Sequence, residues 1–166
     1  NIEKVLGEFR TACIKQFGYE PSPDQVGWAL PVYVGKSDEE AYEAARPHLE
    51  YLIQKLQHRE PESLFPPGYL TERSMEAVLK MKGAATRAKK YEELIETAFA
   101  VVGSAKTVAD HLERIAERVG AGIVVPMLQF GSMPHEMVLQ NMERFAEHVL
   151  PRLKQFLPSV YNYQNA

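Results

Sequence analysis

Histidine is the residue type in this sequence best suited to proton transfer or metal binding near neutral pH. The chain contains five, at positions His48, His58, His111, His135 and His148. Their spacing matches no metal-binding pair with a supporting carboxylate, so we expect no metal site. His135 is the best placed, because it falls in the first turn of a predicted helix just beyond a strand. A catalytic histidine needs a partner within reach, and no partner can be identified, so the catalytic residues stay unassigned.

The Gly-Ser turn at Gly103 and Ser104 is a second feature suited to chemistry. It lies between an apolar run and a predicted helix, so its backbone amides stand at the helix N-terminus. Amides in this position, aided by the helix dipole, bind phosphate and other anions. The turn has neither the P-loop pattern nor the G-x-G-x-x-G fingerprint. An ordinary strand-to-helix turn with a cap is therefore the favoured interpretation, and phosphate binding is the alternative.

The elements that position these residues follow from an alternating pattern between Phe99 and Arg152. Apolar runs lie at 99–102 and 123–128. Within them, 100–102 and 123–125 are apolar without alternation, which is typical of parallel strands buried on both faces. A helix is predicted over 107–119 and another after Ser132. Each helix carries an apolar stripe with three- and four-residue spacing, made of Val108, Leu112, Ile115 and Val119 and of Val138, Met142, Phe145 and Val149. Strand, helix, strand, helix with short links indicates an α/β protein.

Polar residues and glycine mark where these helices begin and end. Thr107 and Asp110 resemble a capping pair at the start of the helix that ends near Val119. Gly120 then stands where a left-handed stop is needed. Ser37 and Glu40 form a capping-box signature before an earlier helix.

The first strand is predicted over 27–34, after an opening helix that runs to about Gly18 and carries Cys13 on its apolar face. Pro31 interrupts this strand, and since proline cannot donate to a ladder we expect a bulge there or an early end. Pro126 raises the same expectation for the last strand. Cys13 has no partner cysteine, so no internal disulfide forms, and we expect a small buried side chain rather than a reactive thiol.

The segment 59–96 is a long insertion between a helix and the next strand. Prolines and a glycine break its first part, and a basic run with several alanines follows. Insertions of this length are usually functional or mobile. The residues themselves leave a solvated spacer and an active-site lid equally open.

Composition places the chain among ordinary globular proteins. Its 166 residues are 45% hydrophobic and 25% charged, with a formal net charge of −3. This charge gives no reason to expect nucleic acid or an anionic membrane as a partner. No apolar run approaches the roughly 20 residues that span a bilayer, and no secretory segment opens the sequence. We therefore expect a cytoplasmic location.

Four segments of the sequence share a pattern with a known family. They are PVYVGKSDEEAYEAARPHLEYL at 31–52, FPPGYLTERSM at 65–75, VVGSAKTVADHLERIAERVGAGIVV at 101–125 and QFGSMPHEMVLQNMERFAEHVLPRL at 129–153. In this order they resemble the C-terminal end of the bacterial luciferase-like, flavin-dependent monooxygenases. The resemblance covers nearly the whole chain, and its specificity rests on the order of the segments. A complete (β/α)8 barrel takes roughly 250 residues, whereas only three strands are predicted here. The expected fold is the C-terminal part of a TIM barrel, as one domain over 1–166 with the insertion at 59–96.

The resemblance implies a function as well as a fold. Such enzymes bind reduced FMN supplied by a separate flavin reductase, activate O2 and oxidise a small organic substrate, and we expect the isolated chain to be inactive. It also favours a lid for the insertion. The residues expected to face the cofactor pocket are Gly103, Ser104, Gln129, Phe130 and Gly131, with Tyr69 and Met75 on the lid.

Two alternatives to the enzyme remain open. A non-catalytic flavin-binding or structural protein fits the same scaffold, because fold does not fix function. A complete small α/β domain with an open sheet also fits. If the strands do end a barrel, their unpaired edges favour a homo-oligomer.

Overall fold

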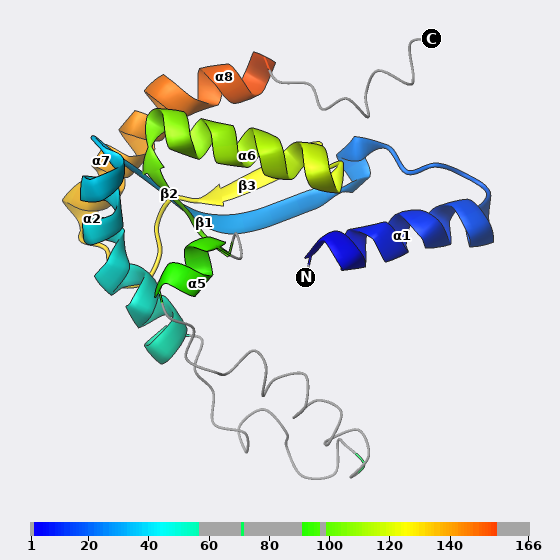
Figure 1. Cartoon of the computed structure of the whole chain (residues 1–166), viewed down its shortest axis with the longest axis horizontal. Helices are drawn as coiled ribbons and strands as arrows, with labels where there is room; N and C mark the ends of the chain where they lie inside the picture. The colour runs from blue at the N-terminus through cyan, green and yellow to red at the C-terminus, as the bar shows by residue number, and fades with distance from the viewer. Residues whose placement is uncertain (1, 57–70, 72–90, 97–98, 156–166) are drawn as a thin grey trace.

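The computed structural model describes residues 2–56, 71, 91–96 and 99–155 of the chain. Three parallel strands form one sheet in the order β2-β1-β3, with β1 at Gly27–Gly35, β2 at Val101–Ser104 and β3 at Ile123–Met127 (Figure 1). Both pairings are parallel. The α/β architecture expected from the alternating pattern is confirmed.

The strand order differs from that of three consecutive barrel units. In a barrel each strand lies between its predecessor and its successor, so the second strand would occupy the middle, whereas here the first one does. The sheet formed by the described residues is open, with β2 and β3 as its edges. The chain therefore contains parallel βα units compatible with part of a barrel, without the closure of one.

Strand β1 shares its length between its two neighbours. Its first half pairs with β3, from Gly27 opposite Ile123 to Pro31 opposite Met127. Its second half pairs with β2, beginning at Val32 opposite Val101. The expected bulge or early end at Pro31 is wrong, since β1 continues to Gly35. The proline is tolerated because it stands where one ladder ends and the other begins, and Pro126 is tolerated because β3 is an edge strand.

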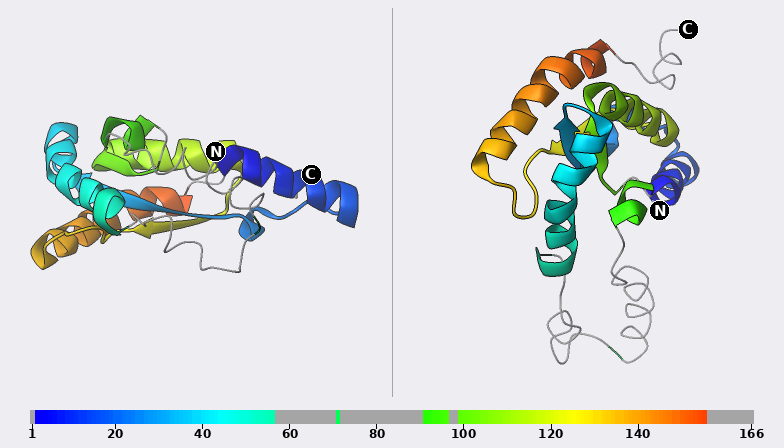
Figure 2. Two further views of the ribbon diagram at one scale, coloured as in Figure 1. Left: turned by 90° about the horizontal axis from the view of Figure 1, so that it is seen from below. Right: turned by 60° about the vertical axis from the view of Figure 1, so that its left-hand side comes forward.

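Helices cover both faces of the sheet, and their bounds are as follows: α1 Ile2–Phe17, the 3-10 turn η1 Pro23–Gln25, α2 Asp38–Tyr51, the π-helical segment η2 Leu52–Leu56, α5 Tyr91–Glu96, α6 Ala105–Val119, α7 His135–Arg144, the π-helical segment η3 Phe145–Val149 and α8 Leu150–Gln155. Residues of α2 and α5 belong to one apolar cluster on the sheet, and residues of α6 and α8 belong to the other. Figure 2 shows the helices around the strands from two further directions.

Each face of the sheet buries its own apolar cluster. Trp28, Leu30 and Val32 of β1 pack with α6 and η3. Tyr33 and Val102 face the opposite way and pack with α2, α5 and Phe130. A buried side chain of this size contributes about 1.5–3 kcal/mol relative to an exposed one, so the two clusters fix the strands between the helical layers.

Helix α6 begins two residues earlier than its sequence suggests. The cap is Ser104, whose hydroxyl accepts a hydrogen bond from the Thr107 amide. Thr107 is therefore not the cap, and Asp110 instead pairs with Lys106 at 2.6 Å. Gly120 ends the helix at φ 64°, which confirms the predicted left-handed stop.

The buried stripe of α7 also differs from the expected one. Met142 is 48% exposed, whereas Asn141 is fully buried. Asn141, Phe145 and Val149 face the core. On this turn of the helix the buried residue is therefore the polar Asn141, and not Met142 as the apolar pattern predicted. Cys13 is buried, as predicted.

Candidate functional site

Asp38 joins the two strand-to-helix turns that follow β1 and β2. Its carboxylate accepts hydrogen bonds from the Ser104 amide at 2.6 Å and from the Thr107 hydroxyl at 3.0 Å. The hydrogen bond from the Ser104 amide is the main cause that lowers the Asp38 pKa. A carboxylate of the chain therefore occupies the N-terminus of α6, the place where phosphate binding was the alternative to an ordinary capped turn.

Glycines allow this close approach between the two turns. A Cβ atom at Gly103 would come within 2.8 Å of the Asp38 carboxylate and of the Thr107 methyl group. A Cβ atom at Gly35 would collide with Glu40 and Ala41. Glu40 in turn accepts a hydrogen bond from the Lys36 amide at 2.8 Å, while Ser37 caps α2 through the Glu40 amide at 3.2 Å. Half of the predicted capping box is confirmed: Ser37 caps the helix, but the Glu40 carboxylate binds the Lys36 amide instead of the Ser37 amide.

The turn after β3 packs against α2 rather than opening towards solvent. Phe130 is buried in the cluster beneath α2, and Gln129 is exposed. Gly131 has φ 59°, and a Cβ atom there would overlap the His48 carbonyl. This close contact gives Phe130 and Gly131 a structural role.

The expected cofactor residues do not form one cluster. Gly103 and Ser104 end β2, whereas Gln129, Phe130 and Gly131 follow β3, and β1 lies between these two edges. Their role in cofactor binding stays a prediction. Tyr69 and Met75, with most of the insertion 59–96, lie outside the described residues.

Asn141 is a buried polar residue that the sequence analysis did not single out. Its amide oxygen accepts from the Val34 amide at 2.8 Å, and its amide nitrogen donates to the carbonyls of Val32 at 2.8 Å and Leu128 at 2.9 Å. It thereby joins α7 to β1 and to the end of β3. The sequence did hold a signal for this burial: Asn141 lies three residues after Val138 and four before Phe145, a spacing that puts it on the same helix face as these apolar residues.

Among the histidines, His48 and His111 occupy partly buried positions. The His48 Nδ1 atom lies 3.0 Å from the Ser132 hydroxyl, and burial lowers the pKa of the imidazole. Burial also lowers the pKa of His111, with a smaller contribution from Arg114. Within the described residues, no group of three or more His, Cys, Asp or Glu side chains is arranged to hold a metal ion.

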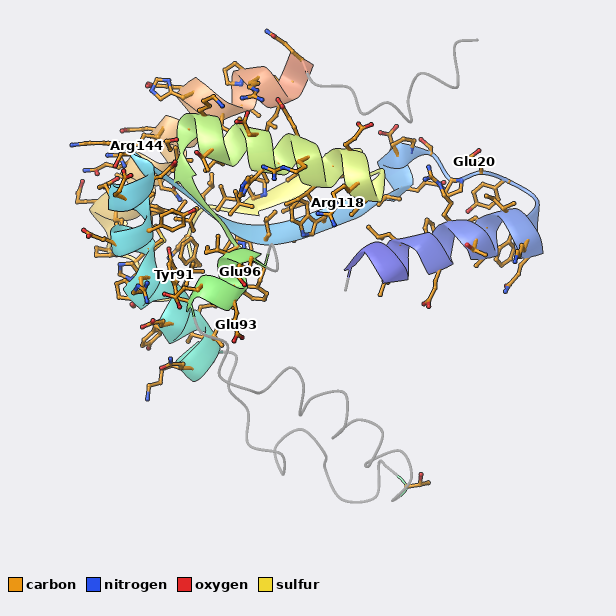
Figure 3. All side chains as sticks on the ribbon, in the orientation of Figure 1. Glu20, Tyr91, Glu93, Glu96, Arg118 and Arg144 are labelled. Carbon is orange, nitrogen blue, oxygen red and sulfur yellow. The ribbon has the colours of Figure 1, made fainter. Side chains whose placement is uncertain are left out.

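An open hollow of about 440 Å³ lies beside the carboxyl ends of β1 and β2. Its walls come from three parts of the chain: the end of β1, the first turn of α6, and the helical segment formed by α7 and η3. Four of its lining residues are basic, Lys36, Lys106, Arg144 and His148, and the others are Val34, Gly35, Ser104 and Ala105. No carboxylate is among the lining residues. Figure 3 labels Arg144 at this end of the sheet.

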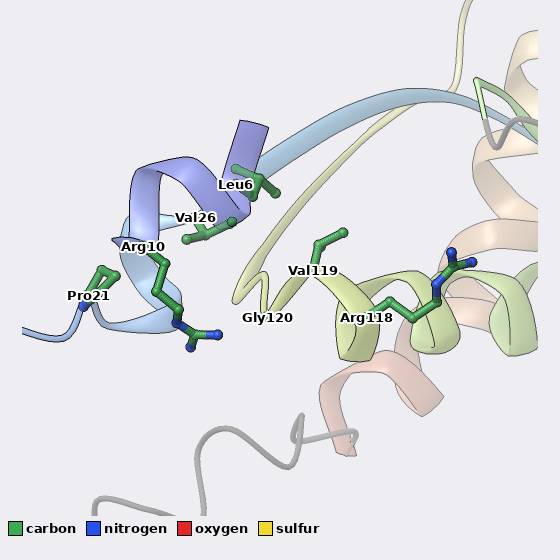
Figure 4. Close-up of a pocket in the computed structure, with 8 residues that line it drawn as sticks. Leu6, Arg10, Pro21, Val26, Arg118, Val119 and Gly120 are labelled. Atoms are coloured by element: carbon green, nitrogen blue, oxygen red, sulfur yellow. The ribbon is translucent and has the colours of Figure 1, made fainter. Parts of the chain in front are cut away.

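A smaller hollow of about 90 Å³ lies at the opposite end of the sheet, between α1 and the end of α6. Arg10 and Arg118 both line it, but Figure 4 shows their side chains directed apart. Arg10 lies 3.6 Å from Glu20. This hollow has neither the size nor the convergent charge of the first.

Tyr91 closes the cluster beneath α2 and carries a buried hydroxyl. Arg46 stacks over its ring with 4.5 Å between the guanidinium carbon and the ring centroid, and Tyr42 meets it edge-on. Within the described part of the chain its hydroxyl has no hydrogen-bond partner. Burial raises the pKa of this tyrosine.

No protein-family model matches the sequence, and no curated protein matches it. Solved structures do resemble the fold. The monooxygenase RslO1 from Streptomyces bottropensis is 21% identical, with a TM-score of 0.55 over 90% of this chain and 37% of its own.

A second similar structure is a type II Baeyer-Villiger monooxygenase, the oxygenating constituent of 3,6-diketocamphane monooxygenase from Pseudomonas putida, in complex with FMN. It is 17% identical, with a TM-score of 0.61 over 95% of this chain and 41% of its own. The chain thus shares a fold with part of these proteins and spans about two fifths of their length. No helix among the described residues is long and apolar enough to cross a membrane.

Proposed function

We propose that this chain is part of a flavin-dependent monooxygenase of the luciferase-like type, which uses reduced FMN and O2 to oxidise a small organic substrate. The observation that carries the proposal is the likeness of 95% of the chain to part of an FMN-bound monooxygenase structure. The order of the four sequence segments points to the same class independently. Identity is low in both structural comparisons, so the substrate is not assigned by them.

The residues of the hollow fit the phosphate group of FMN better than its flavin ring system. The hollow at the carboxyl ends of β1 and β2 is lined by cations and backbone, with Val34 and Ala105 as its apolar members. Such a donor set suits the phosphate group and not the planar ring system, because flavin rings need apolar walls and a few placed polar groups. We therefore expect the ring to be held by residues outside this hollow.

Reduced flavin supplies the two electrons of the reaction, with one oxygen atom entering the substrate and the other leaving as water. The chain's own contribution is a rigid frame, in which Asp38 and Asn141 hold the turns at the carboxyl ends of the strands. A frame of this kind keeps binding groups in place without reorganisation. We also propose a flavin reductase as the partner that supplies the reduced cofactor.

Oxygen consumption with chemically reduced FMN and a cyclic ketone tests the proposal, because a ketone is the substrate class named for one similar structure. We expect ketone-dependent oxygen uptake and an ester product in the protein that carries this chain. Uptake that yields only hydrogen peroxide, with or without ketone, would contradict monooxygenation. Flavin binding without any uptake would favour the alternative, a non-catalytic flavin-binding protein.

A further inference from the structure

We propose that the hollow at the carboxyl ends of β1 and β2 binds a phosphate group, through Lys36, Lys106 and Arg144. The proposal rests on three basic residues from separate elements that line one cavity of about 440 Å³. It goes beyond the proposed function, because it concerns an anion site that holds whether or not the chain takes part in oxygen chemistry.

The three cations differ in how far they are already engaged. Lys36 is exposed, and no ion pair of its ammonium group is present among the described residues. Arg144 donates a hydrogen bond to the Val34 carbonyl at 3.2 Å and also interacts with the Tyr33 hydroxyl. A guanidinium group has five N–H donors, so part of it is left for a ligand. Lys106 pairs with Asp110 at 2.6 Å, but it is highly exposed and attached by a flexible stem. Lys106 therefore has to turn from Asp110 towards the hollow.

Carboxylates near the hollow are held away from it by the chain. Asp38 binds the Ser104 amide and the Thr107 hydroxyl, and Glu40 binds the Lys36 amide. Neither lines the hollow. His148 lines it, with its Nε2 atom 3.8 Å from Glu147, and adds positive charge only when protonated.

The first turn of α6 borders the hollow, but the Asp38 carboxylate already takes up part of its capacity to bind an anion. Ser104, Ala105 and Lys106 line the hollow at the N-terminal end of this 15-residue helix, where the helix dipole favours anions. Asp38 already uses the Ser104 amide, so the side-chain cations contribute most of the binding. A phosphate group, with three acceptor oxygens and up to two negative charges, matches several donors arriving from different sides.

Calorimetric titration of the full chain with inorganic phosphate at low salt tests the site. We expect saturable one-to-one binding that weakens as salt is added, since the site is open to solvent. Lys36→Gln should weaken binding by about fivefold, as expected for one exposed charge pair, and Lys36→Gln combined with Lys106→Gln should weaken it further. Lys15→Gln on α1 removes the same charge far from the hollow and should leave the affinity unchanged.

FMN and riboflavin, which differ by one phosphate group, identify the source of that group. If FMN binds more tightly than riboflavin and the double variant removes the difference, the hollow takes the phosphate of the flavin. If inorganic phosphate binds and FMN does not, the anion site stands and the link to flavin is contradicted. If neither phosphate nor FMN binds saturably, or if the double variant binds both as the unaltered chain does, the site assignment is wrong.

Discussion

The side-chain oxygen of Asn141 accepts a hydrogen bond from the backbone amide of Val34 at 2.8 Å. With its amide nitrogen bonded to Val32, Asn141 pairs with β1 beyond the end of β3. One side chain thus takes the place of an adjacent strand for two residues.

Asn141→Leu should therefore destabilise the chain strongly. Leucine has a similar volume but leaves the Val34 amide and the Val32 carbonyl without this partner, and each buried group left unsatisfied costs about 1–3 kcal/mol. We expect a loss of roughly 3 kcal/mol in the free energy of unfolding, measured by urea denaturation. Gln140→Leu, at an exposed position of the same helix, is the control, and equal stability of the two variants would refute the role of Asn141.

Asp38→Ala should lower stability at neutral pH, and the loss should fade in acid. The folded pKa of Asp38 lies below its unfolded value, so the carboxylate stabilises the fold above a pH of about 4. That contribution is lost as the pH falls through the lower, folded pKa. Urea midpoints of the variant and the unaltered chain should differ at pH 7 and approach each other as the pH falls through the folded pKa of Asp38, where the carboxyl group becomes protonated. Glu43→Ala, an exposed carboxylate on α2, should show no such convergence, and a pH-independent effect of Asp38→Ala would contradict the pKa argument.

Tyr91→Phe should raise stability by about 1 kcal/mol, because a buried hydroxyl without a partner carries a desolvation cost. The ring contacts with Arg46 and Tyr42 remain in the variant. Thermal unfolding measures the effect, with Tyr42→Phe as the comparison. A destabilised Tyr91→Phe chain would mean that the hydroxyl has a partner outside the described residues.

Gly131→Ala should destabilise the chain by more than about 2 kcal/mol, since the left-handed backbone alone costs an alanine 1–2 kcal/mol. The added methyl group would also overlap the His48 carbonyl. Gly7→Ala in α1 is the matched control, with no atom within 4 Å of the added group. It should be neutral or stabilising, because alanine favours helix. Chemical denaturation of both variants measures the free energy of unfolding. Equal values for Gly131→Ala and the unaltered chain would contradict the tight contact.

Self-association through the edge strand β3 is the last prediction. Ile123, Val125 and Met127 are 44%, 50% and 38% exposed, and they lie on one face of that strand. An apolar edge strand invites pairing with another chain, so we expect dimers or larger species by sedimentation equilibrium at micromolar concentration. Val125→Lys should shift the chain towards monomer. A sharply melting monomer in the unaltered chain would contradict this expectation.

Local sequence patterns predicted the elements well, because helix stripes and apolar runs depend on neighbouring residues. The helix ends marked by Gly120 and Ser37 were also predictable, because a cap depends on residues close to it in the sequence. The strand order was not predictable in this way, because the position of β1 between β2 and β3 depends on contacts between distant segments. The same limit applies to Asp38, whose role at the N-terminus of α6 requires the turn after β1 to meet the turn after β2. Lys36, Lys106 and Arg144 are ordinary surface cations in the sequence, and only the fold brings them to one hollow.

The division of β1 between two neighbours has a consequence for the order in which the chain is assembled during synthesis. Its edge beyond β3 is completed by Asn141, a residue that follows Val34 by 107 positions. When the ribosome has made β1, α2 and β2, half of the central strand is still without its partner. Chains dominated by such distant pairings fold slowly, and an open strand edge in the meantime favours aggregation. The nascent chain therefore most needs protection from aggregation in the interval before α7 emerges from the ribosome.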